Sequence, residues 1–83
     1  MQINLQLNYQ LKLANGKEVG VYNEKVSGGI IDKYVGPFDT LEECKQYCDE
    51  YTEATRMGYN GRASFVYLNG EHYAACSRWT SCD

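Results

Sequence analysis

Polar and apolar residues alternate without a break from Gln2 to Leu13. The apolar set is Ile3, Leu5, Leu7, Tyr9, Leu11 and Leu13. Because successive side chains of a strand point to opposite faces, the pattern predicts one long strand with an apolar face and a polar face. Such a face must be covered in water, so we expect a helix from the rest of the chain to pack on it.

The chain has 83 residues, which predicts a single domain over residues 1–83 with one modest core. Tyrosine is frequent, with 8 copies against 2 Phe and 1 Trp. Its large ring with a polar tip suits half-buried sheet positions and binding surfaces alike. The net charge of −3 argues against direct binding of nucleic acid, because such domains usually carry a basic patch.

The first residues, Met-Gln-Ile-Asn, have neither the basic start nor the apolar run of a signal peptide. No stretch approaches the roughly 20 apolar residues that a membrane span needs. We therefore expect a cytoplasmic protein without a membrane partner, in the host cytoplasm if the chain is phage-encoded. A secreted mature chain carrying an added Met is the alternative.

The segment 14–17, Ala-Asn-Gly-Lys, is a hairpin signal. A two-residue turn at Asn15-Gly16 would direct Val19 and Val21 to the polar face. A three-residue loop over 14–16, with Gly16 left-handed in a bulge, keeps both valines beside the leucines of the first strand. We therefore predict the three-residue loop. Its pairs are Leu13 with Lys17, Leu11 with Val19 and Tyr9 with Val21.

A second strand is predicted over about 18–25, and Ser27-Gly28-Gly29 breaks it. A short third strand follows, because Ile30, Ile31, Tyr34 and Val35 are β-formers. Gly36-Pro37 is expected to end this strand.

A helix is predicted to start at Thr40-Leu41-Glu42-Glu43, which fits a capping box, and to end at about Arg56 or Met57. One stripe at steps of three and four is expected to be buried: Leu41, Cys44, Cys48, Tyr51 and Thr55. Off this stripe lie Glu42, Lys45, Gln46, Asp49, Glu50 and Glu53.

A second hairpin is predicted over about 62–78 around a two-residue turn at Asn69-Gly70. Its expected core side is Ala63, Phe65, Ala74 and Cys76, with Tyr67 and His72 near the turn. The other side carries Val66, Leu68 and Tyr73. The order of elements predicts an α+β fold, with an antiparallel or mixed sheet of four to five strands and one helix on one face.

Two hairpins that flank a helix resemble the β-grasp layout of ubiquitin and of immunoglobulin-binding bacterial domains. The segment 13–17, Leu-Ala-Asn-Gly-Lys, is similar to the first turn of ubiquitin. That fold hosts many unrelated functions, so the resemblance implies an architecture and no activity.

The four cysteines allow three interpretations. Cys44 and Cys48 are one helical turn apart and point the same way, which disfavours a bond between them. All four can be reduced, with Cys44, Cys48 and Cys76 in the core. They can form two disulfides, such as Cys44 with Cys76 and Cys48 with Cys82. They can bind zinc, although structural zinc sites favour shorter spacings such as C-x2-C.

Three pieces of the sequence resemble the PAN/Apple adhesion modules: Cys44-Lys-Gln-Tyr-Cys48, the segment Ala63-Ser-Phe-Val-Tyr67, and Cys76. The cysteine which that family carries before its Phe-x-Tyr strand is missing, and Gly61 or Arg62 stands near its place. The resemblance implies an extracellular, disulfide-bonded recognition module, which is one alternative for the function.

Sequence motifs give no support for catalysis. The one histidine, His72, lies two residues after a turn, and a catalytic role would need a nucleophile or a metal beside it. Gly28-Gly29 lacks the rest of any phosphate-binding loop. We therefore expect a protein that is not an enzyme and uses no cofactor, with a small zinc-bound structural protein as a further alternative.

The predicted helix carries most of the charge. Residues 39–56 hold six acids and two bases, a local charge of −4, whereas the rest of the chain sums to +1. This side is either a solvated helix face or a surface that meets a basic protein partner. A row of carboxylates can also imitate the phosphates of a nucleic acid.

Arg, Trp and Tyr are enriched at binding hot spots, and they occur in the segment 56–62 and at Arg78-Trp79. The same residues could instead pack a helix end. The predicted partner-binding residues are Glu42, Asp49, Glu50, Glu53, Arg56, Tyr59, Arg78 and Trp79.

A small, acidic chain of this kind resembles the phage-encoded anti-CRISPR inhibitors. In one such family the chain ends in a helix and a hairpin with a tail that bears tryptophan and cysteine, and Asn69-Gly70, Arg78-Trp79 and Cys82 are similar. The resemblance implies binding to a CRISPR effector complex and blocking of its nucleic-acid channel. The leading hypothesis is therefore a non-enzymatic, protein-binding inhibitor.

Overall fold

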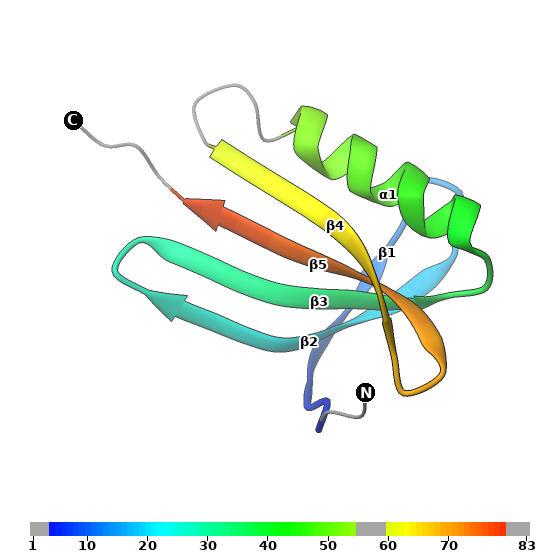
Figure 1. The fold of residues 1–83 in the computed structure, drawn as a ribbon, viewed down its shortest axis with the longest axis horizontal. Coiled ribbons are helices and arrows are strands. Elements are labelled where there is room, and N and C mark those ends of the chain that lie inside the picture. Colours follow the sequence, from blue (N-terminus) through cyan, green and yellow to red (C-terminus); the bar gives the residue numbers. More distant parts are fainter. Residues whose placement is uncertain (1–3, 55–59, 80–83) are drawn as a thin grey trace.

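The computed structural model describes residues 4–54 and 60–79, which form one antiparallel sheet and one helix (Figure 1). In chain order the elements are β1 (Leu7–Lys12), β2 (Glu18–Ser27), β3 (Ile30–Phe38), α1 (Leu41–Ala54), β4 (Asn60–Leu68) and β5 (Glu71–Trp79). The five strands are arranged in the order β1-β2-β3-β5-β4. The predicted α+β fold, with a helix packed on one face of the sheet, is confirmed.

The first hairpin has the predicted three-residue loop. Leu11 pairs with Val19, Tyr9 pairs with Val21, and Gly16 has a positive φ of 90°. The Leu13 amide donates to the Lys17 carbonyl at 2.7 Å. Val19 and Val21 are buried, so burial selected the register as expected.

A bulge at Asn8 breaks the alternation of the first strand. Tyr9 pairs with Val21, but Leu7 pairs with Tyr22, so Leu7 lies on the opposite face from Tyr9. The prediction of one continuous apolar face was therefore wrong. Leu7 is 50% exposed and Tyr9 is 44% exposed, whereas Leu11 and Leu13 are half-buried against the core.

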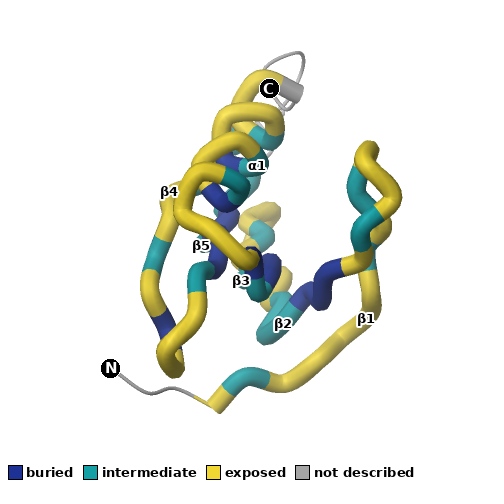
Figure 2. The backbone as a smooth tube through the Cα atoms, turned by 90° about the vertical axis from the view of Figure 1, so that its right-hand side faces the viewer, coloured by how far each residue is buried: buried dark blue, intermediate teal, exposed yellow. Residues whose placement is uncertain are grey.

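The sequence predicted that the helix packs on the first hairpin, and this prediction was wrong. The helix backbone lies close to β3, β4 and β5 and, among the described elements, not to β1 or β2. Figure 2 shows the first hairpin turning up beside the helix, with buried positions in the layer between them. Lys17 in this hairpin bridges to the start of α1, because its Nζ lies 2.7 Å from Asp39 Oδ2 and 2.8 Å from Glu43 Oε1.

The predicted capping box forms in part. The Glu43 amide donates to Thr40 Oγ1 at 3.1 Å, but the Glu43 carboxylate accepts from the Asp39 amide at 3.4 Å instead of reaching Thr40. Cys44 and Cys48 of the predicted stripe are buried and Tyr51 is half-buried, whereas Leu41 is 37% exposed. Thr55 and the predicted helix end at Arg56 or Met57 lie outside the described residues.

The third strand is longer than predicted, because Gly36-Pro37 does not end it. β3 continues to Phe38, which pairs with His72 across an irregularity in the register. Gly36 is needed there: a Cβ at this position would lie 2.8 Å from Cδ2 of Tyr73 and 3.0 Å from the His72 carbonyl oxygen.

The second hairpin has the predicted two-residue turn, with positive φ at Asn69 and Gly70 and pairing of Leu68 with Glu71. Its predicted division into two faces is confirmed by the register, but the burial differs. Phe65 and Tyr67 on the helix face of the sheet are 50% and 63% exposed, because they lie beyond the part that α1 covers. On the opposite face Leu68 and Tyr73 are buried.

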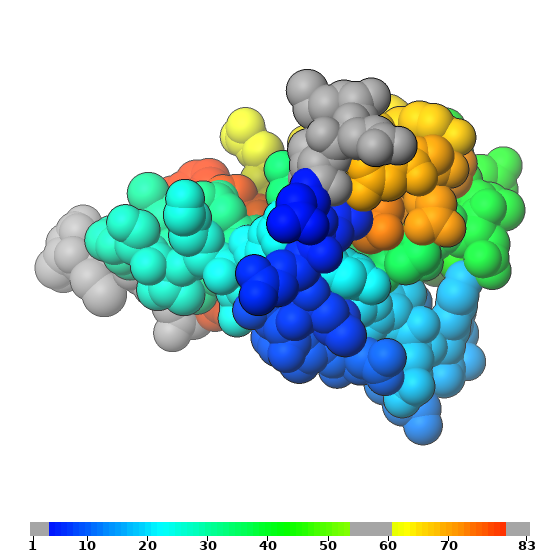
Figure 3. All heavy atoms as spheres, turned by 90° about the horizontal axis from the view of Figure 1, so that it is seen from below, coloured from blue at the N-terminus to red at the C-terminus, as the bar shows by residue number. Residues whose placement is uncertain are grey.

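The N-terminal segment crosses the face of the sheet opposite the helix (Figure 3). Asn23, which has a φ of 53°, holds it there. The Asn23 side chain accepts from the Gln6 amide at 2.7 Å and donates to the Asn4 carbonyl at 3.0 Å. α1 therefore packs on one face of the sheet, and residues 4–6 cross the other.

Candidate protein-interaction surface

The outer side of α1 presents carboxylates to solvent. The helix turns 100° per residue, so with Cys44 and Cys48 on the sheet side the positions about half a turn away from them lie outside. The exposed acids, which we call the acidic helix surface, are Glu42, Asp49, Glu50 and Glu53. The predicted exposure of all four is confirmed, and they lie on one rigid element.

Two other acids of this region form ion pairs within the fold. Lys17 Nζ binds both Asp39 and Glu43, and these two hydrogen bonds raise the pKa of Lys17. Among the described residues, Glu42, Asp49 and Glu50 form no ion pair. Gln46 Nε2 donates to Glu50 Oε2 at 3.2 Å, which orients that carboxylate without neutralising it.

The position of the acids along the helix is unfavourable for the helix itself. Asp49, Glu50 and Glu53 lie in its second half, and its last turn contains no basic residue within Leu41–Ala54. Negative charge near the C-terminus of a helix opposes the macrodipole and costs about 0.3–1 kcal/mol per group. Residues that break a local rule in this way are often retained for function.

Arg78 and Trp79 do not join the acidic helix surface or each other. Adjacent strand residues point to opposite faces, so the two side chains separate across the sheet. Arg78 is half-buried on the helix face, close enough to Tyr51 for its charge to lower the pKa of that phenol against the larger raising effect of burial. Trp79 is 37% exposed on the other face. Arg56 and Tyr59 lie outside the described residues.

The cysteines of the helix and of β5 are free thiols. Cys44, Cys48 and Cys76 are all buried between α1 and the sheet, and Cys44 Sγ donates to the Tyr73 carbonyl at 3.2 Å. The structure therefore has no bond between Cys44 and Cys76, and Cys82 lies outside the described residues. Burial raises the pKa of both Cys48 and Cys76 to about 12, which keeps these thiols protonated and poorly nucleophilic. Within residues 4–54 and 60–79 no group of three potential ligands could hold a metal ion.

Sequence reasoning missed one exposed apolar group on the helix face of the sheet. Phe65 and Tyr67 were assigned to the core, but both are exposed. Lys45 Nζ lies 5.0 Å from the centre of the Phe65 ring, and the Tyr67 ring packs on His72 with centroids 5.1 Å apart. No sequence pattern indicated this exposure, because it depends on which strands the helix covers.

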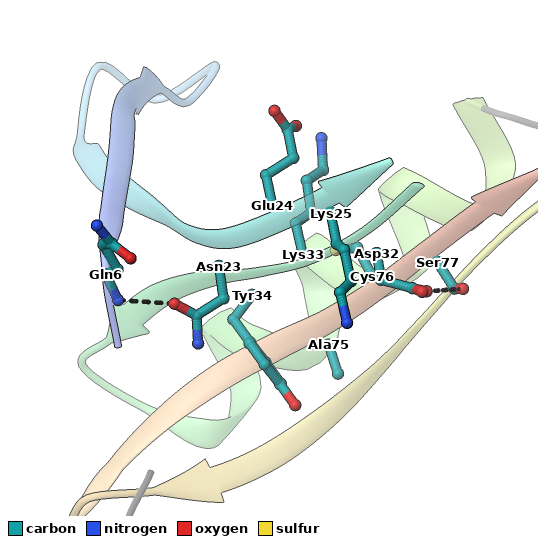
Figure 4. Close-up of a pocket in the computed structure, with 10 residues that line it drawn as sticks. All are labelled: Gln6, Asn23, Glu24, Lys25, Asp32, Lys33, Tyr34, Ala75, Cys76 and Ser77. Carbon is teal, nitrogen blue, oxygen red and sulfur yellow. Dashed lines mark hydrogen bonds between the residues drawn. The ribbon is translucent and has the colours of Figure 1, made fainter. Parts of the chain in front are cut away.

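A polar hollow of about 640 Å³ lies at the bulged junction of β2 and β3 (Figure 4). Its charged lining residues are Glu24, Lys25, Asp32 and Lys33. The Ser77 hydroxyl donates to Asp32, and the Tyr9 hydroxyl donates to Glu24 at 3.0 Å. The two acids and two bases of this hollow balance, so the hollow has no net charge to attract a charged partner, unlike the acidic helix surface.

The described helix is too short and too polar to cross a membrane. Comparisons with protein-family models, with curated proteins and with solved structures found no match to the chain.

Proposed function

We propose that the chain is a non-enzymatic binding protein whose acidic helix surface docks on a basic, nucleic-acid-binding surface of another protein and blocks it. The observation that carries this proposal is the exposure of Glu42, Asp49, Glu50 and Glu53 on one helix, the last three of them in the half where the helix dipole disfavours negative charge. A role outside the fold accounts for their retention.

The electrostatics fit such a role. Carboxylates held on a rigid helix form a row of negative charge, as phosphates do on a nucleic-acid backbone. Complementary charge mainly accelerates encounter and sets orientation, and it disfavours partners of the same sign. The chain as a whole is also negative, at −3, so its long-range field directs a basic surface toward it.

The resemblance to anti-CRISPR inhibitors makes a CRISPR effector complex the first partner to test. The PAN-like alternative requires disulfides from the helix cysteines, and the free thiols at Cys44, Cys48 and Cys76 favour the inhibitor over it. The zinc alternative requires thiolate ligands, whereas burial disfavours the thiolate forms of Cys48 and Cys76.

The test is a gel-shift assay of purified CRISPR effector complex with its target DNA, with increasing amounts of the protein added. We expect the wild type to prevent DNA binding at stoichiometric amounts. The Glu50→Lys/Glu53→Lys variant should require at least about tenfold more protein, because two charges on the interface are reversed. Inhibition should also weaken as ionic strength rises.

The matched control is Glu18→Lys/Glu71→Lys, which changes the net charge by the same amount. Both residues are exposed and lie on the face of the sheet away from the helix. We expect this control to inhibit like the wild type. Equal inhibition by both double variants would exclude the acidic helix surface, and no inhibition by the wild type would exclude this class of partner.

A further inference from the structure

The two edges of the sheet differ in how well they are protected. β1 is short and is interrupted by the bulge at Asn8, two features with which natural sheets prevent edge-to-edge pairing. β4 has nine residues and pairs with β5 without any irregularity from Asn60 to Leu68. Among the described residues no strand lies on its outer side. A long, regular edge of this kind is a template for another strand.

The hairpin turn determines which backbone groups face outward. In a two-residue hairpin the residues beside the turn, here Leu68 and Glu71, form a hydrogen-bonded pair, and the pairs alternate from there. The amides and carbonyls of Ala63, Phe65 and Tyr67 consequently point away from β5. These are also the residues whose side chains lie on the helix face.

Side chains along this edge are apolar and mixed in charge. Phe65 and Tyr67 are 50% and 63% exposed. Two neighbouring aromatic side chains with this exposure form an apolar surface patch. Beside them a hollow of about 270 Å³ opens between α1 and β4, lined by Lys45, Cys48, Asp49, Ala63, Ser64 and Phe65. Lys45 lies over Phe65, and Asp49 lies one helical turn further along the same hollow.

We propose that β4 is the interface of a homodimer, in which two copies of the chain pair antiparallel along this strand about a two-fold axis at Ser64. Ala63 of one protomer then lies opposite the partner's Phe65, with their outward amides and carbonyls in hydrogen-bonded register. The partner's Phe65 ring enters the hollow beside Ala63. The two sheets join into one continuous sheet of ten strands, with the helices side by side on the same face.

Charge complementarity selects this occupant and this register. Lys45 lies over Phe65, and Asp49 lines the same hollow as Ala63. With the axis at Ser64, Lys45 therefore meets the partner's Asp49, and the reverse contact forms by symmetry. An axis at Phe65 would instead bring the two Lys45 side chains together. A partner of one charge sign would match only one of these two residues, whereas a second copy matches both.

The dimer shares Asp49 with the acidic helix surface and otherwise uses different residues. It uses the β4 flank of α1, whereas Glu42, Glu50 and Glu53 stay on the outer side of each helix. Failure of either proposal leaves the other standing.

Sedimentation equilibrium of the full chain tests the dimer, from about 1 µM to about 500 µM, a range that covers weak to moderate self-association. We expect a mass of twice the 9.5 kDa chain at the upper end. Lys45→Asp and Asp49→Lys should each raise the dissociation constant at least about tenfold, because each brings like charges together twice in the dimer. The combined variant Lys45→Asp/Asp49→Lys should return it to within about threefold of the wild type.

The control Lys12→Asp makes the same charge change as Lys45→Asp, but on the other edge strand, where Lys12 is exposed. It should leave the dissociation constant unchanged. Far-UV circular dichroism verifies that each variant is folded, and recovery in the combined variant separates a lost contact from a lost fold. A monomer throughout the range overturns the proposal, as does a dimer that tolerates both single changes or one that only Lys12→Asp disrupts. A combined variant that stays monomeric overturns the Ser64 register.

Discussion

Asn23 and Gln6 hold each other by two hydrogen bonds that cross the sheet face opposite the helix. The backbone amide of Gln6 donates to the side-chain Oδ1 of Asn23 at 2.7 Å. The backbone amide of Asn23 donates to the backbone carbonyl of Gln6 at 2.9 Å. Asn23 also adopts a φ of 53°, a conformation that asparagine tolerates better than most residues. Asn23 thus lies in the irregular part of β2 with a positive φ, and its side chain holds residues 4–6 in place.

Replacing Asn23 should separate these two contributions. Asn23→Gly keeps the positive φ and loses the side-chain bonds, so we expect a loss of about 1–2 kcal/mol in the free energy of unfolding. Asn23→Ala loses the same bonds and adds backbone strain, so it should cost about 1 kcal/mol more than glycine. Urea denaturation measures both, with Gln10→Ala as a control at an exposed position of β1. Equal costs for Ala and Gly would mean that the backbone conformation at Asn23 is not a constraint.

Gly36 and Gly20 face each other across β2 and β3, and a ring covers each of them. A Cβ at Gly36 would meet the backbone of His72 and Tyr73, whereas a Cβ at Gly20 would meet only the outer end of the Tyr22 ring, at 2.6 Å. The Tyr22 ring can rotate away from a new methyl group, whereas the backbone of β5 is held by its pairing with β3 and β4. We therefore expect Gly36→Ala to cost about 2–3 kcal/mol and Gly20→Ala about 1 kcal/mol, by thermal unfolding.

The reverse order of these two costs would show that the Tyr22 ring is held more firmly than the strand pairing. Removing the ring gives an internal check. Gly20→Ala should become nearly neutral when it is measured in a Tyr22→Leu background, because the clashing atoms are then absent.

The buried thiols predict a loss of stability at high pH. Burial raises the pKa of Cys48 and Cys76 from 9.0 to about 12, so between these values the folded chain keeps protons that the unfolded chain has released. The stabilisation is complete below pH 9 and is lost as the pH rises toward 12. Urea unfolding in reductant from about pH 8 to about pH 11 should show a falling free energy of unfolding.

Tyrosines and lysines also titrate in this range, so a variant is needed to assign the slope. Cys76→Ala should be less stable at every pH, because it leaves a small cavity, but its free energy should fall less steeply with pH. If the slope is the same as in the wild type, the thiol of Cys76 does not contribute to it.

Local chemistry made the turns and the helix start predictable from sequence. Gly16 in its bulge, the Asn69-Gly70 turn and the Thr40 cap each depend on residues close in sequence. The bulge at Asn8 depends instead on a distant contact, since Asn8 Oδ1 accepts from the Glu24 amide at 2.8 Å. The alternation of polar and apolar residues cannot predict that contact. One extra residue in the strand moves the side chains that precede it to the opposite face of the sheet.

The candidate surface was also predictable only where it depends on residues close in sequence. Helical periodicity placed the acidic residues outside, because the buried stripe of α1 is a property of the helix alone. The exposure of Phe65 depends on which strands the helix covers, and this follows from packing of the whole sheet. The separation of Arg78 from Trp79 follows from strand alternation, once the strand is known to extend to Trp79.

Leu7 and Leu11 test the bulge directly, because the uninterrupted alternation would make them equivalent. In the structure Leu7 is 50% exposed on the face opposite the helix, and Leu11 packs against the core beside Val19. Leu7→Gln should therefore change the free energy of unfolding by no more than about 0.5 kcal/mol. Leu11→Gln should cost about 2–3 kcal/mol, because it places a polar group against the core. Equal losses from both variants, measured by urea denaturation, would indicate that Leu7 lies on the helix face and would contradict the bulge at Asn8.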